Sequence, residues 1–466
     1  MMGHKGNAMK LSFLGATGTV TGSKYLLSAQ AASGVDTRIL IDCGLFQGLK
    51  QLRLRNWADL PIDPKTLDAV VLTHAHIDHS GYLPLLVKKG YAGKIYCSPA
   101  TRDLCEVLLL DSAHLQEEEA RYANKSGFSK HHPALPLYTT DDAQNALALL
   151  TPIEYEQDVD LGGGLTLRLS PSGHILGSAF VRIHSKKTSV LFSGDIGRPH
   201  DILMKPPATI KQADYLVLES TYGNRLHDRS DPQLKLAEII NQTVQHKGVV
   251  LIPVFAVGRA QELLYYIHLL KASGAIPDHI PVYLNSPMAV DATAIFNHFK
   301  NEHRLSAEQS HALCHVAHMV HGVEESKRLN QQRGPMIILS ASGMATGGRV
   351  VHHLKAFAPN PNNTVLFVGF QAAGTRGAAM LDGADSIKIH GEYVPVRAKV
   401  ALISNLSAHA DYAEIIDWLG GFASPPKQTF ITHGEPVAAD AMRLHLEERL
   451  HWRVTVPDYL ETVNLD

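Results

Sequence analysis

The stretch THAHIDHSG, which begins at Thr73, gathers histidine and aspartate on one short loop. Imidazole and carboxylate groups together suit Zn²⁺, which takes four such ligands in a tetrahedral shell. The loop holds more of these groups than one tetrahedral ion with an open position can use, so we predict two metal ions that share it. The predicted ligands from this loop are His74, His76, Asp78 and His79.

Two ions need further ligands from distant parts of the chain. Three candidates each follow a β-like run and lie beside glycine: His174 in SGHILGS, Asp195 in LFSGDIG and His433 in FITHGE. Each alone reads as an ordinary turn residue at the end of a strand. Because chance does not readily supply the same residue types at four such positions, we predict that these three side chains complete the metal site.

The elements around the histidine loop are mainly strands. KLSFLG, KYLLSA, TRILIDCG and LDAVVLTH are β-like runs, and the loop follows the last of them. A ligand loop at the carboxyl end of a buried strand is typical of α/β proteins. A helix is expected after Ser98, with Pro99 at its first position, and a second group of strands runs from Ile153 to Leu218.

The pattern changes after Glu219. VVLIPVF, VYLNS, MIILSAS and TVLFVGF are short apolar runs that alternate with helical patterns, which predicts a doubly wound parallel sheet in a separate α/β unit. Strands return at RAKVALISN, and a helix is expected from Asp411. We therefore expect residues 220–396 to form an inserted domain, and residues 1–219 and 397–466 to form its host.

Composition limits the class of protein. The chain of 466 residues carries 43 basic and 45 acidic residues, and a net charge of −2 argues against a protein that coats nucleic acid by charge alone. Its four scattered cysteines predict reduced thiols rather than disulfides. No secretion signal and no apolar run of about 18 residues is present. We expect a cytoplasmic protein with no membrane partner, in which the residues before Met9 are a disordered leader.

The order HxHxDH, SGH and SGDIG resembles the metallo-β-lactamase superfamily. ESTYG at Glu219, SAHAD at His409 and THGE at His433 resemble motifs A, B and C of its β-CASP branch, which includes ribonuclease J and the endonuclease of messenger-RNA 3′-end formation. The resemblance extends from Met9 to the C-terminus. It implies an α/β fold, an αββα metallo-β-lactamase sandwich with an inserted doubly wound α/β β-CASP domain.

The same resemblance implies two Zn²⁺ ions per chain, each with its own ligands and one ligand in common. The first ion would be held by His74, His76 and His174, the second by Asp78, His79 and His433, and Asp195 would bridge them. Asp42, in ILIDCG, matches the family aspartate that supports the ligands from behind. Read alone, it is an ordinary turn residue before Gly44.

The implied chemistry is two-metal hydrolysis of a phosphodiester. His409 matches the general acid for the leaving oxygen, and Glu219 would orient it and favour its charged form. Together with Asp78 and Asp195 they form the implied catalytic set. Histidine at position 433 points to RNA, with single strands favoured. A homodimer remains open, as does the choice between internal and 5′-end cleavage.

In the insertion, SASGMATGGR follows a buried strand and precedes a helix, and its glycines would let backbone amides approach an anion. The resemblance places this segment over the RNA backbone. NSPMA, from Asn285, also resembles a family segment, with no chemical role to assign. The candidate phosphate contacts are Ser340, Ser342, Gly343, Gly347, Gly348, Arg349, Arg259 and Arg376.

Five other histidines are not expected to bind metal. His131 and His132 lie beside prolines in what should be an exposed loop, His352 and His353 are expected on a helix surface, and His390 on a strand. Two other functions compete with an RNA hydrolase: a small-molecule hydrolase of the same superfamily, which would lack the insertion and motifs A to C, and a non-catalytic RNA-binding scaffold, which would lack ligands.

Overall fold

The computed structural model describes residues 9–30, 36–127 and 129–465, so the predicted leader before Met9 lies outside the described residues. The chain packs as two compact units. The first contains the described residues of Met1–Gln47, Gln51–Leu226 and His409–Asp466, and the second contains Gly48–Lys50 and His227–Ala408. In the described ranges, no helix combines the length and apolar character needed to span a bilayer.

The first unit contains two seven-stranded sheets among its described residues. One has the order β22-β1-β2-β3-β4-β5-β6, with β22 Thr462–Leu465, β1 Met9–Phe13, β2 Tyr25–Gln30, β3 Asp36–Ile41, β4 Ala69–Val71, β5 Lys94–Cys97 and β6 Leu150–Pro152. The other has the order β21-β20-β11-β10-β9-β8-β7, with β21 Val454–Thr455, β20 Gln428–Thr432, β11 Tyr215–Glu219, β10 Ser189–Phe192, β9 Ala179–His184, β8 Leu165–Pro171 and β7 Val159–Gly162.

The two sheets pack face to face through alternating apolar residues. In β8, for example, every second side chain is fully buried, because successive side chains of a strand point to opposite faces. Burying one such leucine contributes about 1.5–3 kcal/mol. The core between the sheets includes Leu11, Phe13, Leu27, Ile39, Leu165, Leu167, Leu169, Val181, Phe192, Val217 and Phe430.

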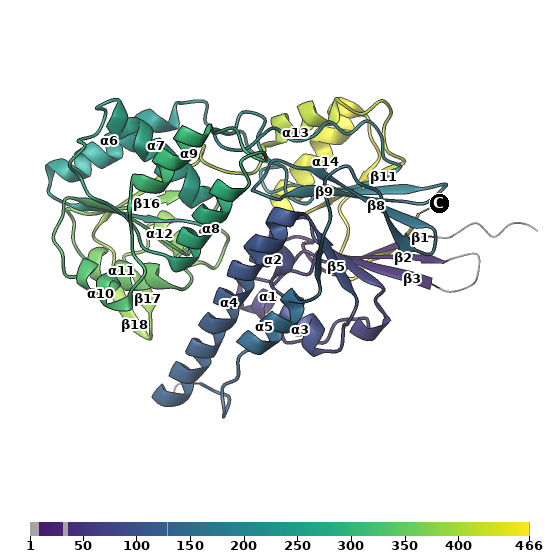
Figure 1. Ribbon diagram of the computed structural model, residues 1–466, viewed down its shortest axis with the longest axis horizontal. Helices are drawn as coiled ribbons and strands as arrows, with labels where there is room; N and C mark the ends of the chain where they lie inside the picture. The colour runs from purple at the N-terminus through teal and green to yellow at the C-terminus, as the bar shows by residue number, and fades with distance from the viewer. Residues whose placement is uncertain (1–8, 31–35, 128, 466) are drawn as a thin grey trace, which may run out of the picture. The chain divides into compact units, whose positions relative to one another are not determined.

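Helices cover the outer faces of both sheets, and this gives the expected αββα sandwich (Figure 1). The helices are α2 Ile77–Ser80, α3 Leu83–Lys88, α4 Pro99–Ser126, α5 Thr140–Leu147, α13 Tyr412–Leu419 and α14 Pro436–Leu450, with the short α1 Lys50–Arg55 and a 3₁₀ turn at Pro64–Thr66. Helix α4 begins as predicted, since the Ser98 hydroxyl accepts a hydrogen bond from the Thr101 amide. Helices α13 and α14 bury Ile415 and Met442 against the second sheet.

Strands β11 and β20 are parallel neighbours although they are far apart in the chain. Their register aligns Glu219 with Thr432, so the loops that follow these two strands leave the sheet side by side. Parallel strands present their carboxyl ends at one edge, where α/β folds usually place chemistry. The segments after Glu219 and after Thr432 therefore reach the same place.

The second unit is the predicted doubly wound α/β layer. A parallel sheet has the order β14-β13-β15-β12-β16-β19, and its strands are β12 Val249–Pro253, β13 Val282–Leu284, β14 His318–Met319, β15 Met336–Ser340, β16 Thr364–Val368 and β19 Lys399–Ile403. Figure 1 shows helices on both faces of this sheet. They are α6 Pro232–Gln245, α7 Arg259–Ala272, α8 Pro287–His298, α9 Ala307–His315, α10 Val323–Leu329, α11 Arg349–Phe357 and α12 Arg376–Leu381, with the hairpin β17 Ser386–Ile389 and β18 Glu392–Pro395.

The second unit ends later than the sequence suggests. We expected a boundary after residue 396, but β19 pairs in parallel with β16 along its whole length, so the run RAKVALISN completes the sheet of the inserted unit. The second unit ends at Ala408, and the first unit resumes at His409. The boundary at the start of the second unit lies between Leu226 and His227 rather than after residue 219. Strand order is not visible in local sequence, and this explains the difference.

Two predictions for individual histidines were wrong. His353 is fully buried rather than on a helix surface, because α11 turns it inward to hydrogen-bond with Asn285 and Asn330. His390 lies not in a strand but between β17 and β18, where its φ of 49° places it in a tight turn. His352 is exposed as expected, and so are His131 and His132.

Candidate metal centre

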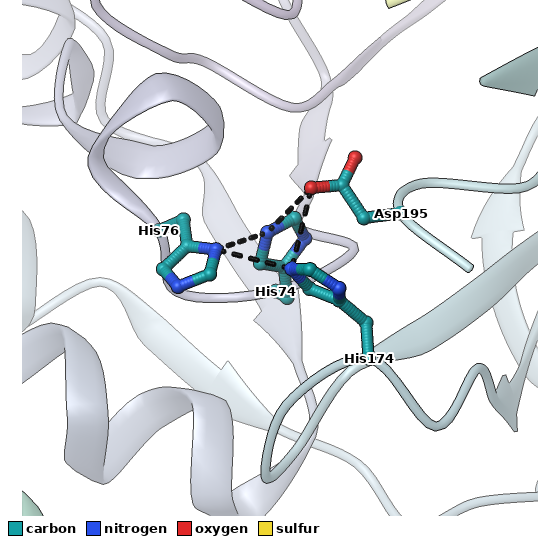
Figure 2. A group of neighbouring side chains, drawn as sticks. All are labelled: His74, His76, His174 and Asp195. Atoms are coloured by element: carbon teal, nitrogen blue, oxygen red, sulfur yellow. Dashed lines mark hydrogen bonds and ion pairs between the residues drawn. The ribbon is translucent and has the colours of Figure 1, made fainter. Parts of the chain in front are cut away.

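The first group of predicted ligands converges at the carboxyl edge of the two sheets. His74 and His76 lie between β4 and α2, His174 follows β8, and Asp195 follows β10. Figure 2 shows the four side chains facing one point. The Nδ1 atom of His76 is 3.1 Å from Nε2 of His74 and 3.3 Å from Nε2 of His174, and Oδ2 of Asp195 is 3.4 Å from both Nε2 atoms.

These spacings fit a tetrahedral zinc site. With metal–ligand bonds of about 2.0–2.1 Å, the edges of a tetrahedron measure about 3.3 Å. Burial lowers the pKa of His74 and of His174 well below the usual value, and lowers the pKa of His76 to about 4. The three rings are therefore neutral, and neutral imidazole is the form that binds metal.

A second group lies beside the first. The Nε2 atom of His79 is 3.1 Å from Nε2 of His433 and 3.8 Å from Oδ2 of Asp78, and His433 Nε2 is 3.4 Å from the same oxygen. The other oxygen of Asp195, Oδ1, is 3.3 Å from His79 Nε2. Asp195 thus faces both groups, one oxygen to each, as a bridging ligand would.

His79 differs electrostatically from the other histidines of the centre. Burial alone would lower its pKa, but the charges of Asp195 and Asp42 outweigh burial and raise the pKa of His79 well above its usual value. A positive charge on this ring is therefore stabilised. A cation at Nε2 would replace the proton there and meet the same two carboxylates.

Asp42 supports the centre from the end of β3. Its carboxylate accepts hydrogen bonds from Nδ1 of His79, 2.7 Å away, and from the Thr73 amide, 2.8 Å away, and it also accepts the Thr73 hydroxyl. Because a carboxylate only accepts, His79 must carry its proton on Nδ1, which leaves Nε2 to the second group. Asp42 has a φ of 56°, a left-handed conformation that aspartate tolerates better than most residues.

The sequence did not single out Thr73, yet it takes part in the same arrangement. Its hydroxyl donates a hydrogen bond to Asp42 and lies 3.1 Å from Nδ1 of His74. The hydroxyl oxygen can therefore accept a hydrogen bond from Nδ1–H of His74, which leaves Nε2 of that ring available to a metal ion. Thr221, also overlooked, contacts both Glu219 and His433. In each case the only sequence signal was a threonine within two residues of a predicted site residue.

His409 and Glu219 form a pair at the edge of the ligand groups. Nδ1 of His409 lies 3.1 and 3.0 Å from the two oxygens of Glu219, and its Nε2 lies 3.9 Å from Oδ2 of Asp195. Glu219 also accepts the Ile196 amide at 2.6 Å, and an antiparallel bridge between Gly197 and His409 holds the two segments together.

This pairing changes the acidity of His409. Burial alone would lower its pKa, but the charges of Glu219 and Asp195, together with the hydrogen bond to Glu219, raise the pKa of His409 to about 9. The imidazolium form is therefore present at neutral pH. The His409 side chain is 17% exposed, whereas that of Glu219 is 1% exposed, so of the two it is the ring that a substrate can reach.

The candidate phosphate contacts all lie in the second unit. The segment from Ser340 to Gly348 forms a turn between β15 and α11, and a Cβ on Gly343 would come within 2.8 Å of the Phe255 backbone nitrogen. Close packing of this turn therefore requires glycine. Whether its amides bind phosphate stays a prediction. The other contacts predicted in this turn are Ser342 and Gly347.

The three predicted phosphate-binding arginines already have partners inside the unit. Arg349 donates to Asn285 Oδ1 and to the carbonyls of Val320 and His321 at 2.8–3.0 Å. The carbonyl partners of Arg376 are Lys388, Ala345 and Thr346, and Arg259 forms a buried ion pair with Glu262. A phosphate would have to compete with these contacts.

NSPMA, to which no role could be assigned, contains the partner of Arg349. The Asn285 carboxamide accepts from Arg349 and donates to Ser326 and His353. Burial lowers the pKa of His353 to about 4, so this ring is a neutral acceptor. The motif thus holds the start of α11 against neighbouring segments.

Three family models match successive parts of the chain: the metallo-beta-lactamase superfamily over residues 31–236, the Beta-Casp domain over 260–380, and the Zn-dependent metallo-hydrolase RNA specificity domain over 393–457. The chain is 37% identical to ribonuclease TTHA0252 of Thermus thermophilus, over 92% of this chain and 93% of that protein. It is 31% identical to the transcription termination factor FttA of Methanosarcina mazei, over 98% of this chain and 72% of that protein.

The fold also matches a solved structure. A protein of unknown function from Enterococcus faecalis superposes with a TM-score of 0.54 at 12% identity, covering 98% of this chain and all of that one. At this identity the match concerns the fold alone.

Proposed function

Because the chain belongs to the β-CASP family of the metallo-β-lactamase superfamily, we propose that it is a zinc-dependent ribonuclease that hydrolyses RNA phosphodiester bonds with two metal ions. The observation that carries this proposal is the His409–Glu219 pair beside the two ligand groups. A metal centre alone would suit many hydrolases. An imidazolium at its edge suits a reaction whose leaving oxygen needs a proton.

The residues fit the two ions in number, type and spacing. The first would be held by His74, His76 and His174 and the second by Asp78, His79 and His433, with Asp195 shared. Bound Zn²⁺ would supply an acidified water and positive charge beside the phosphate oxygens. Histidine and carboxylate ligands of this kind favour zinc over magnesium or calcium, which prefer oxygen alone.

Residues of the chain would donate the proton, orient the proton donor and orient a metal ligand. His409, charged at neutral pH, would donate the proton on Nε2 to the leaving oxygen, since Nδ1 is held by Glu219. Glu219 would orient the ring and stabilise its charge throughout. Asp42 would fix His79 in the tautomer that binds metal.

RNA is the substrate class that the comparisons support. The model matched over residues 393–457 describes an RNA specificity domain, and that segment includes His409 and His433. The preference for single strands, the cytoplasmic location and a homodimer remain predictions from the sequence, as do phosphate contacts on the turn between β15 and α11.

Neither competing function accounts as well for these features. A small-molecule hydrolase would have no need of the inserted α/β unit. A non-catalytic scaffold would have no need to keep every predicted ligand and the His409–Glu219 pair in one place. The complete set of ligands favours an enzyme.

The proposal is tested with RNA labelled at either end and bearing a 5′-hydroxyl, monophosphate or triphosphate. We expect cleavage that a chelator abolishes and zinc restores, with about two zinc ions per chain in the purified protein. The ladder of labelled products separates internal from 5′-end cleavage. A protein with two bound zinc ions that cleaves none of these RNAs would contradict the proposal.

A further inference from the structure

Thr221 is buried between two functional groups of the proposed site. Its hydroxyl oxygen lies 2.6 Å from Oε2 of Glu219 and 3.1 Å from Nδ1 of His433. The side chain is enclosed, with 2% of the residue exposed. One oxygen atom thus links the carboxylate that holds His409 to a predicted metal ligand.

The pairing of β11 with β20 produces this contact. Glu219 ends β11 opposite Thr432, which ends β20, so Thr221 and His433 lie just beyond the aligned ends. The Ser220 amide donates to the His433 carbonyl at 3.2 Å, and the Ser220 hydroxyl donates to the Thr432 carbonyl at 2.9 Å. These bonds hold both turns together independently of the Thr221 side chain.

The direction of the hydrogen bonds follows from the chemistry of the groups. A hydroxyl has one proton, and the short contact to Glu219 assigns it to the carboxylate, which can only accept. The His433 carbonyl, at 3.2 Å, is a weaker competitor for that proton. Toward the His433 ring, Thr221 must then act as acceptor, which requires the ring proton on Nδ1.

We propose that Thr221 is a positioning residue that holds His433 in the Nδ1-protonated tautomer and connects this ligand to the charge of Glu219. The lone pair of His433 then lies on Nε2, the atom 3.1 Å from His79 Nε2 in the second ligand group. This inference rests on the proposed function only in taking His433 as a metal ligand.

Two other histidines of the centre are oriented in a similar way. Asp42 accepts from Nδ1 of His79 directly, and the Thr73 hydroxyl lies between Nδ1 of His74 and Asp42. Thr221 repeats the second arrangement, with Glu219 as the carboxylate. Glu219 also contacts His409, so hydrogen bonds connect the proposed metal ligand His433, through Thr221 and Glu219, to the proposed proton donor His409. Outer partners of metal-binding histidines typically change metal affinity 10–100-fold when they are removed.

The test compares Thr221→Val, which keeps the shape of threonine without its hydroxyl, with Thr221→Ser, which keeps the hydroxyl. The control is Thr429→Val on β20, where the buried hydroxyl has no hydrogen-bond partner in the described structure. Zinc occupancy is measured by titration of the 466-residue chain against a competing chelator. We expect Thr221→Val to bind the zinc ion of the group containing His433 about 10–100-fold less tightly, and Thr221→Ser and Thr429→Val to bind it like the parent.

Equal zinc affinity in the parent and Thr221→Val would overturn the inference, as would an equal loss in Thr221→Val and Thr221→Ser. If Thr221→Val does not fold, Thr221→Ala and Thr221→Ser give the same comparison. RNA cleavage is not needed for this readout. A parent protein that binds two zinc ions without cleaving RNA would contradict the proposed function, while the difference in zinc affinity would still decide the role of Thr221.

Discussion

His409 and Glu219 are 190 positions apart in the chain, and Nδ1 of the histidine lies 3.0 Å from Oε2 of the glutamate. The pair is held at both ends, since Glu219 ends β11 and His409 bridges to Gly197. A carboxylate bound to Nδ1 leaves Nε2 to face the ligand groups. This geometry suits separate roles for the proposed proton donor and the proposed metal ligands, and the first prediction follows from it.

Replacing His409 with alanine should slow cleavage strongly without emptying the proposed metal centre. Loss of a general acid typically costs 10²–10⁴-fold in rate. We expect kcat on labelled RNA to fall by that order while zinc content stays at the parent level. The exposed His131→Ala variant serves as control and should cleave normally. Parent-like cleavage by His409→Ala would exclude it as the acid.

The same residue should set the alkaline side of the pH profile. With its pKa raised to about 9, mainly because the charges of Glu219 and Asp195 outweigh burial, His409 is protonated below that pH and loses its proton above it. Activity should therefore fall as pH rises through about 9. Initial rates from pH 6 to 10 test this, and the residual activity of His409→Ala should lack the decline. A decline of the same shape in both proteins would assign it to another group.

Asp42→Asn should weaken zinc binding about 10–100-fold. Asparagine tolerates the left-handed backbone of this position, so the change acts mainly on hydrogen bonds. The Asp42 carboxylate now accepts hydrogen bonds from the amide and hydroxyl of Thr73 and from Nδ1 of His79. In the variant, an NH₂ group, which donates, would replace one of these accepting oxygens. Chelator titration measures the effect, and Asp63→Asn, at an exposed cap of a 3₁₀ turn, is the matched control. Unchanged zinc affinity would show that Asp42 does not orient His79.

That the proposed ligands lie together could be predicted from sequence because segments that follow strands carry distinctive side chains, as at His174 and Asp195. Contacts made by ordinary hydroxyls could not. The contact between Thr221 and His433 depends on the pairing of β11 with β20, which no local pattern reveals. The same reason explains the error for His353, whose partners come from two other segments of its unit.

Lys24 should make the free energy of unfolding depend on pH in the alkaline range. Its ammonium group is buried against the rings of Phe46 and Tyr82 and donates to the Gly44 carbonyl, and burial lowers the pKa of Lys24 from 10.5 to about 8. Below pH 8 the folded protein carries the cost of a buried charge. Between about pH 8 and 10.5 the unfolded state binds more protons, so this cost declines as pH rises.

The measurement compares parent and Lys24→Met in urea at pH 7 and pH 10. We expect the free energy of unfolding of the parent, relative to the variant, to increase by about 3 kcal/mol over this range. Taking the difference removes groups that titrate in both proteins. A constant difference would show that the Lys24 amine keeps an ordinary pKa.

Arg349→Gln should destabilise the second unit. The guanidinium makes three hydrogen bonds, to Asn285, Val320 and His321, and hydrogen bonds to charged groups contribute about 1.5–3 kcal/mol each. Arg333, an exposed arginine of the same unit, supplies the control Arg333→Gln. Unfolding in urea should show a loss for Arg349→Gln alone. Normal stability with weaker RNA binding would instead favour the phosphate-contact role.

The order of the site residues along the chain also matters during synthesis. The histidine loop, His174, Asp195 and Glu219 leave the ribosome well before His409 and His433, which follow the whole inserted unit. A nascent chain that ends before His409 therefore contains most of the proposed ligands but neither the proposed proton donor nor His433. Under the proposed chemistry, a chain that ends before His409 lacks a proton donor for cleavage of RNA.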